Sequence, residues 1–207
     1  MSEHQIKQIT TVELPPFSDT RIMMMPFHWH DPVGSLPELN GWRNTIVQIL
    51  NYAPRVNDIG YITIDEYVIE AGLTQRRPGL HMDGTGAWGG PAPYAACGMY
   101  LVSSMIGCRG WNQIVPANPG IDGDCEHMRP HLDPACEILM QANQVYWCSP
   151  TAVHEALPMV ETTARQLLRI SMPSSAPHHV PYTLNPCGVE PATSPGERRD
   201  IQMSYRN

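Results

Sequence analysis

The pattern of apolar and polar positions changes character near Gly60. Residues 61–69 read Tyr-Ile-Thr-Ile-Asp-Glu-Tyr-Val-Ile, a run of β-branched and aromatic residues that is typical of a strand. Similar short runs recur to residue 172, separated by clusters of Gly, Pro, Asn and Asp that favour turns. Besides a strand around Met23, the expected strands are 61–69, 80–83, 99–105, 111–115, 144–148, 152–156 and 166–172. About eight short strands at this spacing predict a mainly β domain, a jelly roll or cupin-like barrel.

One stretch before Gly60 has helical periodicity instead. Ser35-Leu36-Pro37-Glu38 has the form of a capping box, with Pro in the first turn. Apolar residues follow at helical spacing, namely Leu39, Trp42, Ile46 and Ile49. We therefore expect an amphipathic helix over residues 36–52, packed against the wall of the barrel.

Proline and glycine mark two further segments of the chain as irregular. Residues 116–136 contain enough of both to predict a long insert loop, and residues 173–207 contain six prolines, which predicts an extended arm. The expected organisation is one domain over residues 1–172, including the N-terminal lead-in and helix, followed by the arm 173–207. Such an arm can wrap the barrel or a neighbouring subunit, so it offers a route to an oligomer.

Composition narrows the class of partner. The formal net charge is -7 with only 13 Lys plus Arg, which disfavours a surface for duplex nucleic acid because such affinity rests on neutralising phosphates. No apolar run of about 18 residues predicts a membrane span, and the N-terminus lacks the layout of a signal peptide. The six cysteines form no C-x-x-C pair, so reduced thiols are expected. A cytoplasmic protein with a small-molecule substrate fits these features best.

Candidate metal ligands occur at two places in the chain. His81-Met82-Asp83 puts two ligand types two residues apart, and on a strand this spacing brings both side chains to one face. His154 lies about seventy residues later, in a segment that is also expected to be a strand. Two histidines and one carboxylate make the facial triad of non-haem iron oxygenases, which leaves positions open for a co-substrate and oxygen.

Two arginines are expected to share one face of the strand 166–172 and its approach. Arg165, Leu167, Arg169 and Ser171 alternate with Gln166, Leu168, Ile170 and Met172. Guanidinium groups grip carboxylates in a bidentate fork, so an arginine facing the barrel interior beside a metal is suited to anchor a dicarboxylate.

Together, His81-x-Asp83, His154 and Arg165 resemble the His-x-Asp...His...Arg signature of the Fe(II)/2-oxoglutarate-dependent dioxygenase superfamily, over roughly residues 60–172. The resemblance implies a double-stranded β-helix in which His81, Asp83 and His154 are catalytic and bind iron, with 2-oxoglutarate and O2 as co-substrates. The arginine spacing is similar to that of taurine dioxygenase-like members, which would make Arg165 the co-substrate anchor and Arg169 its neighbour on the co-substrate or substrate side. Arg169-Ile-Ser171 also resembles the Arg-x-Ser pair of plant-type members, which would instead give this role to Arg169 and Ser171.

The function implied by this resemblance is hydroxylation, or a related oxidation, of a small polar substrate such as an amino acid or a natural-product intermediate. Asp83 supports hydroxylation, since the halogenases of the superfamily carry Gly or Ala at this position. Two alternatives stay open: a cupin-like metal enzyme that does not use 2-oxoglutarate, and a non-catalytic barrel that serves as a binding module.

Other motifs compete less well. His28-Trp-His30-Asp31 resembles the His-x-His opening of cupins but precedes the strand-rich region. Zinc-type side chains also occur in the insert loop at a spacing that matches no usual structural zinc site, namely Cys125, His127, His131 and Cys136. The Gly-rich residues 84–90 are expected to form a flap beside the metal, with Trp88 over the substrate. Candidates for a second hydrogen bond to the co-substrate are Tyr61, Tyr67, Tyr100 and Ser103.

Overall fold

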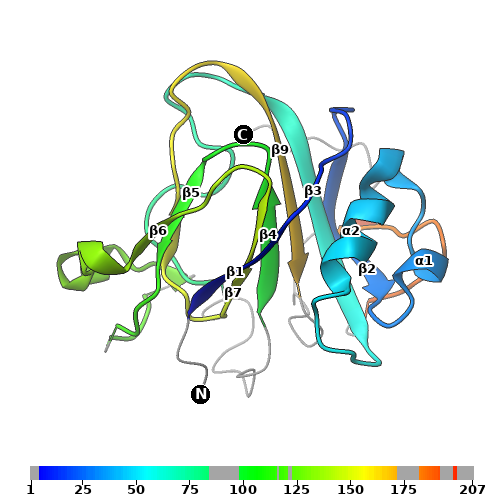
Figure 1. The fold of residues 1–207 in the computed structure, drawn as a ribbon, viewed down its shortest axis with the longest axis horizontal. Coiled ribbons are helices and arrows are strands. Elements are labelled where there is room, and N and C mark those ends of the chain that lie inside the picture. Colours follow the sequence, from blue (N-terminus) through cyan, green and yellow to red (C-terminus); the bar gives the residue numbers. More distant parts are fainter. Residues whose placement is uncertain are drawn as a thin grey trace.

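The chain folds into two facing antiparallel sheets with few helices (Figure 1). The computed structural model describes residues 5–83, 98–115, 117–120, 123–171, 182–191 and 198–199. The larger sheet has six strands in the order β1-β7-β4-β9-β3-β2. Its strands are β1 (Ile6–Thr11), β2 (Arg21–His28), β3 (Ile59–Ile69), β4 (Met99–Ser103), β7 (Gln144–Cys148) and β9 (Thr163–Ser171).

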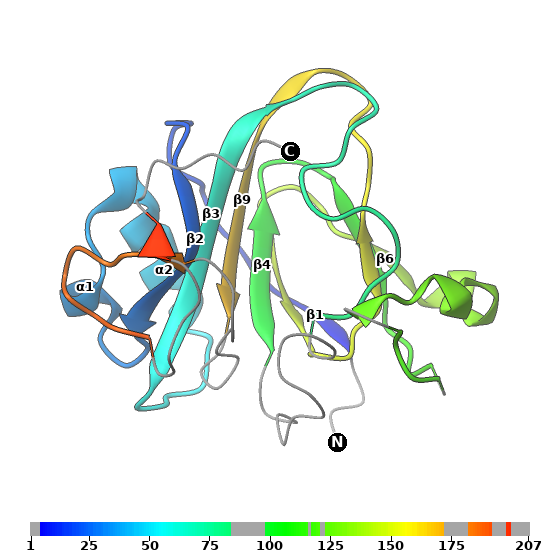
Figure 2. The ribbon, with the colours of Figure 1, turned by 180° about the vertical axis from the view of Figure 1, so that it is seen from behind.

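The smaller sheet faces one surface of the larger one (Figure 2). It contains three antiparallel strands in the order β6-β5-β8, which are β6 (Glu137–Leu139), β5 (Cys108–Trp111) and β8 (His154–Ala156). An apolar cluster joins the two sheets, with Leu101 and Leu167 from the larger sheet and Cys108 from the smaller. The expectation of a mainly β fold is confirmed.

Strand β9 shows why the site lies between the sheets. It pairs with β3 without a break from Tyr61↔Ser171 to Ile69↔Thr163, and with β4 on its other edge. Its even positions Leu168 and Ile170 pack into the core beneath the helices, whereas Arg165, Leu167 and Arg169 face the space between the sheets. The alternation read from the sequence is therefore present in the strand.

Helices α1 (Pro32–Ser35) and α2 (Trp42–Leu50) cover the outer face of β2 and β3 (Figure 1). From α2, Trp42, Ile46 and Ile49 are fully buried in the largest apolar cluster. The prediction of a helix that flanks the sheets near the N-terminus is thus confirmed.

The expected start of that helix is wrong. Residues 36–41 are not α-helical, because Leu39, Asn40 and Gly41 have φ of 54°, 53° and 95°, in the left-handed region. A 3-10 turn, η1 (Leu39–Gly41), occupies this stretch. Ser35 caps nothing here, since its hydroxyl donates to the carbonyl of Asp31 and accepts from the backbone N–H of His28.

Several strand boundaries also differ from expectation. Residues 80–83 form only isolated bridges at His81, and the expected strand 111–115 lies earlier, as β5. Strands β1 and β6 were not expected, nor were the short strands β10 (Tyr182–Thr183) and β11 (Arg198–Arg199) of the C-terminal segment. Strand β7 occupies the expected residues 144–148, and β2, β3, β4, β8 and β9 overlap their expected ranges.

The insert 116–136 is only partly a loop. Two 3-10 helices, η3 (Glu126–His131) and η4 (Pro134–Cys136), lie within it, and Asp124 forms a bridge with His81. The cysteines among the described residues are free thiols, namely Cys108, Cys125, Cys136, Cys148 and Cys187.

Part of the C-terminal segment packs on the domain. Strand β10 (Tyr182–Thr183) pairs in parallel with β11 (Arg198–Arg199) and lies against β2. Thr183 Oγ1 accepts from the backbone N–H of Met23, and the buried Asn185 amide donates to the carbonyls of Pro26 and Ser35. Residues 173–181 lie outside the described part of the chain.

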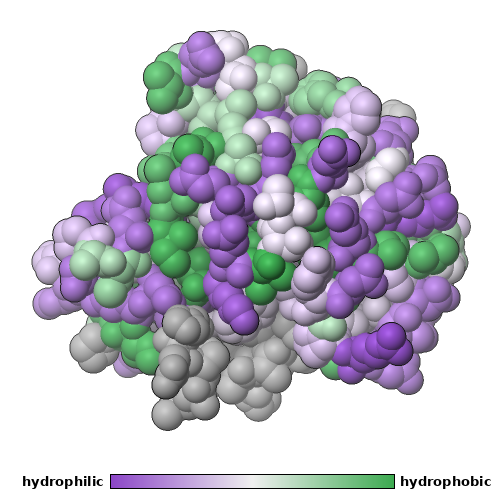
Figure 3. Space-filling view, in the orientation of Figure 1, coloured by the Kyte–Doolittle hydropathy of each residue, from purple (hydrophilic) through white to green (hydrophobic). Residues whose placement is uncertain are grey.

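The face shown in Figure 3 mixes hydrophilic and hydrophobic patches, as is normal for a folded domain. No helix in the described ranges is long and apolar enough to cross a membrane.

Candidate metal centre

His81 and His154 are brought together by backbone pairing. The N–H of each residue donates to the carbonyl of the other, at 2.9 Å and 3.0 Å, so the two form an antiparallel bridge. Their imidazole rings lie 4.3 Å apart between centroids. The sequence segments that carry them are far apart along the chain, and the sheet topology alone makes them neighbours.

The ring orientation of both histidines is fixed in the same way. Nδ1 of His81 lies 2.8 Å from the carbonyl of Gly79, and Nδ1 of His154 lies 2.9 Å from that of Ala152. A carbonyl oxygen only accepts, so both Nδ1 atoms must carry the proton. In the tautomer that these contacts favour, each ring presents the lone pair of Nε2, which is how metal-ligating histidines are usually oriented.

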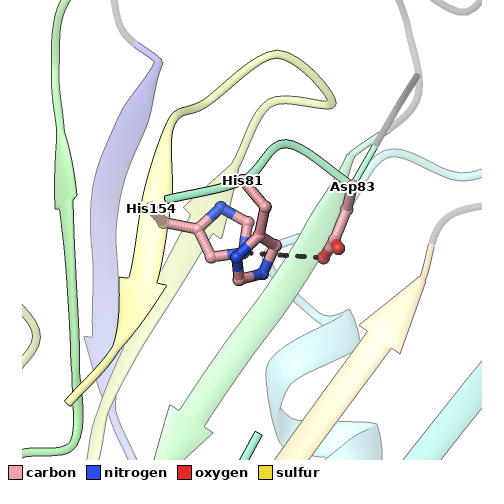
Figure 4. Close-up of side chains that lie close together, drawn as sticks. All are labelled: His81, Asp83 and His154. Atoms are coloured by element: carbon pink, nitrogen blue, oxygen red, sulfur yellow. Dashed lines mark ion pairs between the residues drawn. The ribbon is translucent and has the colours of Figure 1, made fainter. Parts of the chain in front are cut away.

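Asp83 completes the group (Figure 4). Its Oδ2 lies 3.7 Å from His154 Nε2 and 3.4 Å from Arg169 Nη1. Burial acts to raise the pKa of Asp83, but the charges of His154, Arg169 and His81 together outweigh it and lower this pKa to about 2. Burial, followed by the proximity of His154, lowers the pKa of His81 and favours its neutral form. Both states are those that a metal requires of its ligands.

These three side chains can hold a metal ion. One ligand atom from each lies within 4.8 Å of the other two, and no other such group of His, Cys, Asp or Glu exists in the described ranges. Two imidazoles and one carboxylate on one side of an ion are the donor set that suits Fe(II) with open positions. The donor set therefore fits the metal that the sequence predicts.

The triad borders a cavity of about 400 Å³ between the two sheets. Its apolar wall includes Met99, Leu101 and Leu167, and its charged side chains are five arginines and two aspartates. The charged residues are Arg21, Arg76, Arg77, Arg165, Arg169, Asp65 and Asp83. The volume lies in the range of small-molecule sites.

Arg165 is a buried cation in this cavity wall, with 1% of its surface exposed. Its Nε donates to Ser103 Oγ at 2.8 Å, and its Nη1 has no hydrogen-bond partner among the described residues. No carboxylate in that part of the chain forms an ion pair with it, and burial lowers its pKa. A buried guanidinium without a counter-charge is costly, which points to an anionic ligand.

Arg169 has different surroundings. Its Nη1 contacts Asp83, and its Nη2 lies 3.3 Å from Met24 Sδ. Ser171 is buried two positions further along β9 and is not among the residues that line the cavity in the described part of the chain. Arg169 Nε, like Arg165 Nη1, is buried without a hydrogen-bond partner among the described residues, so the two arginines differ in that Arg169 pairs with the Asp83 carboxylate.

An ion-pair network supports both histidine segments from outside the cavity. Buried Glu155, next to His154, pairs with Arg109 at 2.6 Å and with Arg129 at 2.8 Å. Arg129 also pairs with Glu126 at 2.8 Å, and Glu126 accepts from the backbone N–H of Leu80, next to His81. Arg129 thus links the two ligand-bearing segments. Sequence reasoning missed this link, because the residues share no motif.

The remaining sequence candidates divide between the cavity and other parts of the fold. His28 and His30 are exposed, have tilted rings 5.7 Å apart between centroids and are not cavity residues in the described ranges. Of the candidate hydroxyls, Ser103 contacts Arg165 and Tyr67 lines the cavity, whereas Tyr100 packs beneath the helices. The expected flap 84–90 with Trp88 lies outside the described residues.

No family model and no curated protein sequence matches the chain. Among solved structures it resembles a non-heme monooxygenase, ThoJ in its apo form, with a TM-score of 0.39 and 15% sequence identity. The likeness covers 69% of this chain and 55% of that one, so the chain spans about half the length of this neighbour. The likeness is weak, and the side chains of the site carry the functional assignment.

Proposed function

We propose that the chain is a non-haem Fe(II)- and 2-oxoglutarate-dependent oxygenase, built on a double-stranded β-helix, that hydroxylates a small polar substrate. One observation supports this above the others: the unpaired, buried guanidinium of Arg165 lines the same cavity as the His81, Asp83 and His154 group. A metal site alone needs no such cation, whereas a dicarboxylate that chelates the metal needs one.

Each residue has a role in this scheme. His81 and His154 would hold iron through Nε2, and Asp83 through its carboxylate. Iron bound there would supply the oxygen chemistry by which one oxygen atom enters the substrate and the other enters succinate as CO2 leaves. Arg165 would bind the distal carboxylate of 2-oxoglutarate, and Gly107 leaves room for its guanidinium. Leu101 and Leu167 would keep water from the space between these ends.

The fold proposal follows from the same geometry. The ligand-bearing segments belong to the smaller sheet and its extension, whereas the co-substrate arginine lies on the larger sheet. A cavity enclosed by two antiparallel sheets in this way supports a double-stranded β-helix.

Anaerobic titration tests the function before any substrate is known. Purified protein is loaded with Fe(II), and 2-oxoglutarate is then added while the visible spectrum is recorded. We expect a charge-transfer band from the chelate, which His154→Ala abolishes through loss of iron binding. Iron binding without a band would contradict 2-oxoglutarate use and favour the cupin-like alternative. Absence of iron binding in the folded wild-type protein would favour the non-catalytic barrel.

A further inference from the structure

A second group of charged side chains lines the cavity on β2, β3 and the segment after β3. Arg21 and Asp65 are directly opposite each other on β2 and β3, with 3.9 Å between Nη1 and Oδ1. Arg76 reaches the same carboxylate from the segment after β3, at 3.5 Å, and Arg21 stacks on the ring of Tyr67 at 4.2 Å. We call Arg21, Asp65, Tyr67 and Arg76 the Asp65 cluster.

The Asp65 cluster and the Arg165 guanidinium are adjacent subsites that face different strands. Arg165 turns towards β4, where it contacts Ser103, whereas Arg21 and Asp65 lie on β2 and β3. Arg165 is itself directly opposite Tyr67 of β3, so the two subsites adjoin. The turn of the Arg165 side chain towards β4 is what directs its guanidinium away from the cluster. One ligand carboxylate at Arg165 therefore leaves the cluster available to another group.

The charge of the cavity is not balanced by iron and 2-oxoglutarate. Arg77 has a further interaction and is left out of the count, so four arginines against two aspartates leave a formal excess of two positive charges among the described lining residues. Both aspartates are already in ion pairs. Fe(II) and the 2-oxoglutarate dianion carry equal and opposite charges, so loading the site leaves the excess unchanged.

We propose that the substrate is a small anion whose carboxylate or sulfonate group binds at the Asp65 cluster, chiefly to Arg76. This inference rests on the proposed function and specifies its substrate class. Arg76 is the accessible cation of the cluster, with 31% of its side chain exposed, and its single carboxylate contact is a loose one at 3.5 Å. A guanidinium in this state retains donors for a second anion.

The position of the cluster suits a short substrate. Asp65 pairs with Leu167, which is two residues from Arg169, and Arg169 contacts Asp83 of the triad. Two residues along a strand span about 7 Å, so a substrate anchored at the cluster reaches the metal with a body of amino-acid size. The cavity of about 400 Å³ also limits the two ligands together to small molecules.

The test compares anions with a neutral analogue on the loaded protein. The Fe(II) and 2-oxoglutarate complex is formed anaerobically, and butyrate, propanesulfonate and butyramide are titrated in turn by calorimetry. We expect one or both anions to bind at least about tenfold more tightly than butyramide. The charge-transfer band must persist, because its loss would mean that the probe had displaced 2-oxoglutarate from Arg165.

Two variants locate the binding. Arg76→Met should weaken anion binding about tenfold and leave iron and 2-oxoglutarate binding unchanged, and Arg76→Lys should lie between it and wild type. Arg43→Met is the matched control, because Arg43 pairs with Glu38 beside α2 and is not a cavity residue. The comparison of butyrate and propanesulfonate with butyramide uses the wild-type protein. It therefore tests whether the cavity prefers an anion even if Arg76→Met fails to fold.

Equal binding of butyramide and the anions would overturn the inference, as would wild-type anion affinity in folded Arg76→Met. If no charge-transfer band forms at all, the proposed function fails separately. Anion titration of the metal-free Arg165→Gln protein then tests the Asp65 cluster by itself, and absence of binding there overturns this inference too.

Discussion

Arg165 and Arg169 lie on the same face of β9, but their side chains have different ionic partners. Arg165 is buried without a carboxylate partner in the described part of the chain, whereas Arg169 is held by Asp83. Four residues along one strand separate an arginine with no carboxylate partner among the described residues from one that pairs with a carboxylate of the candidate metal site.

Arg165→Gln should raise the 2-oxoglutarate concentration needed for half-saturation roughly 10- to 100-fold, the loss expected for a charged hydrogen-bonded contact. Iron binding should change little, because Arg165 contacts none of the three ligands. The charge-transfer titration measures both quantities. Arg169→Gln is the comparison, and it should act mainly on the iron site and substrate. A co-substrate defect confined to Arg169→Gln would reverse the assignment.

Gly107→Ala tests the same subsite without touching a charge. A Cβ at this position would collide with the guanidinium carbon of Arg165, so the side chain must move. We expect 2-oxoglutarate affinity to fall by about tenfold or more while iron still binds, as judged by the same titration.

Gly72→Ala is its control. The added Cβ meets no atom within 4 Å, but the φ of 83° strains any residue with a side chain. It should therefore lower stability and leave 2-oxoglutarate affinity unchanged. If both alanine variants lowered the affinity equally, general destabilisation would explain the effect.

At the scale of elements, the segments around His81 and His154 are joined by Arg129 as well as by their backbones. Arg129→Met removes the ion pairs to Glu126 and Glu155 together. We expect iron affinity to fall about tenfold, the lower end of the effect of losing a supporting contact to a metal site. Calorimetric or competitive metal titration measures it, with urea unfolding as a check on stability.

Glu126→Gln provides the milder comparison. It keeps an oxygen to accept from the N–H of Leu80 but weakens the charge pairing with Arg129. It should retain more iron affinity than Arg129→Met. Reduced stability with wild-type iron affinity in Arg129→Met would show that the network supports the fold alone.

The elements also show what sequence could predict. The alternation in residues 165–172 placed Arg165, Leu167 and Arg169 on one face of β9, and these three line the cavity because the other side of the strand is packed on a core and the period of two is then strict. The capping box at Ser35 was a wrong prediction, since the left-handed backbone at residues 39–41 starts the helix later. His81 needed no full strand, because one bridge was enough to align it.

The Asp65 cluster could not be predicted in the same way. Arg21 and Asp65 meet only because β2 pairs with β3 in one register, and that register contains an irregularity between Ile22 and Met25. Arg76 reaches them from an irregular segment. Contacts of this kind depend on the three-dimensional path of the chain. Local patterns in the sequence carry no information about that path.

At the scale of the whole molecule, charge is distributed unevenly. The chain carries a formal charge of -7, yet its described cavity lining has an excess of positive charge. An acidic exterior around a basic cavity disfavours polyanions and admits small anions that fit inside.

The C-terminal segment contributes to the stability of the folded domain. Asn185 is buried and donates to the carbonyls of Pro26 and Ser35, so it ties residues 182–191 to β2 and α1. Asn185→Ala should lower the free energy of unfolding in urea by about 1–3 kcal/mol, because two buried acceptors lose their donor. Leu184→Ala, at a more exposed neighbour, should cost less. Equal costs would mean that the two amide contacts contribute little.

The reciprocal backbone bonds between His81 and His154 have a consequence for how the protein acquires its metal. Main-chain contacts orient both rings, so folding of the chain sets two ligands of the proposed metal site. A metal ion would then add stability to a chain that already folds, unlike in small zinc domains that fold only around their ion. Such a chain could exchange one divalent ion for another, and the supply of metals around it would help to decide which ion it carries.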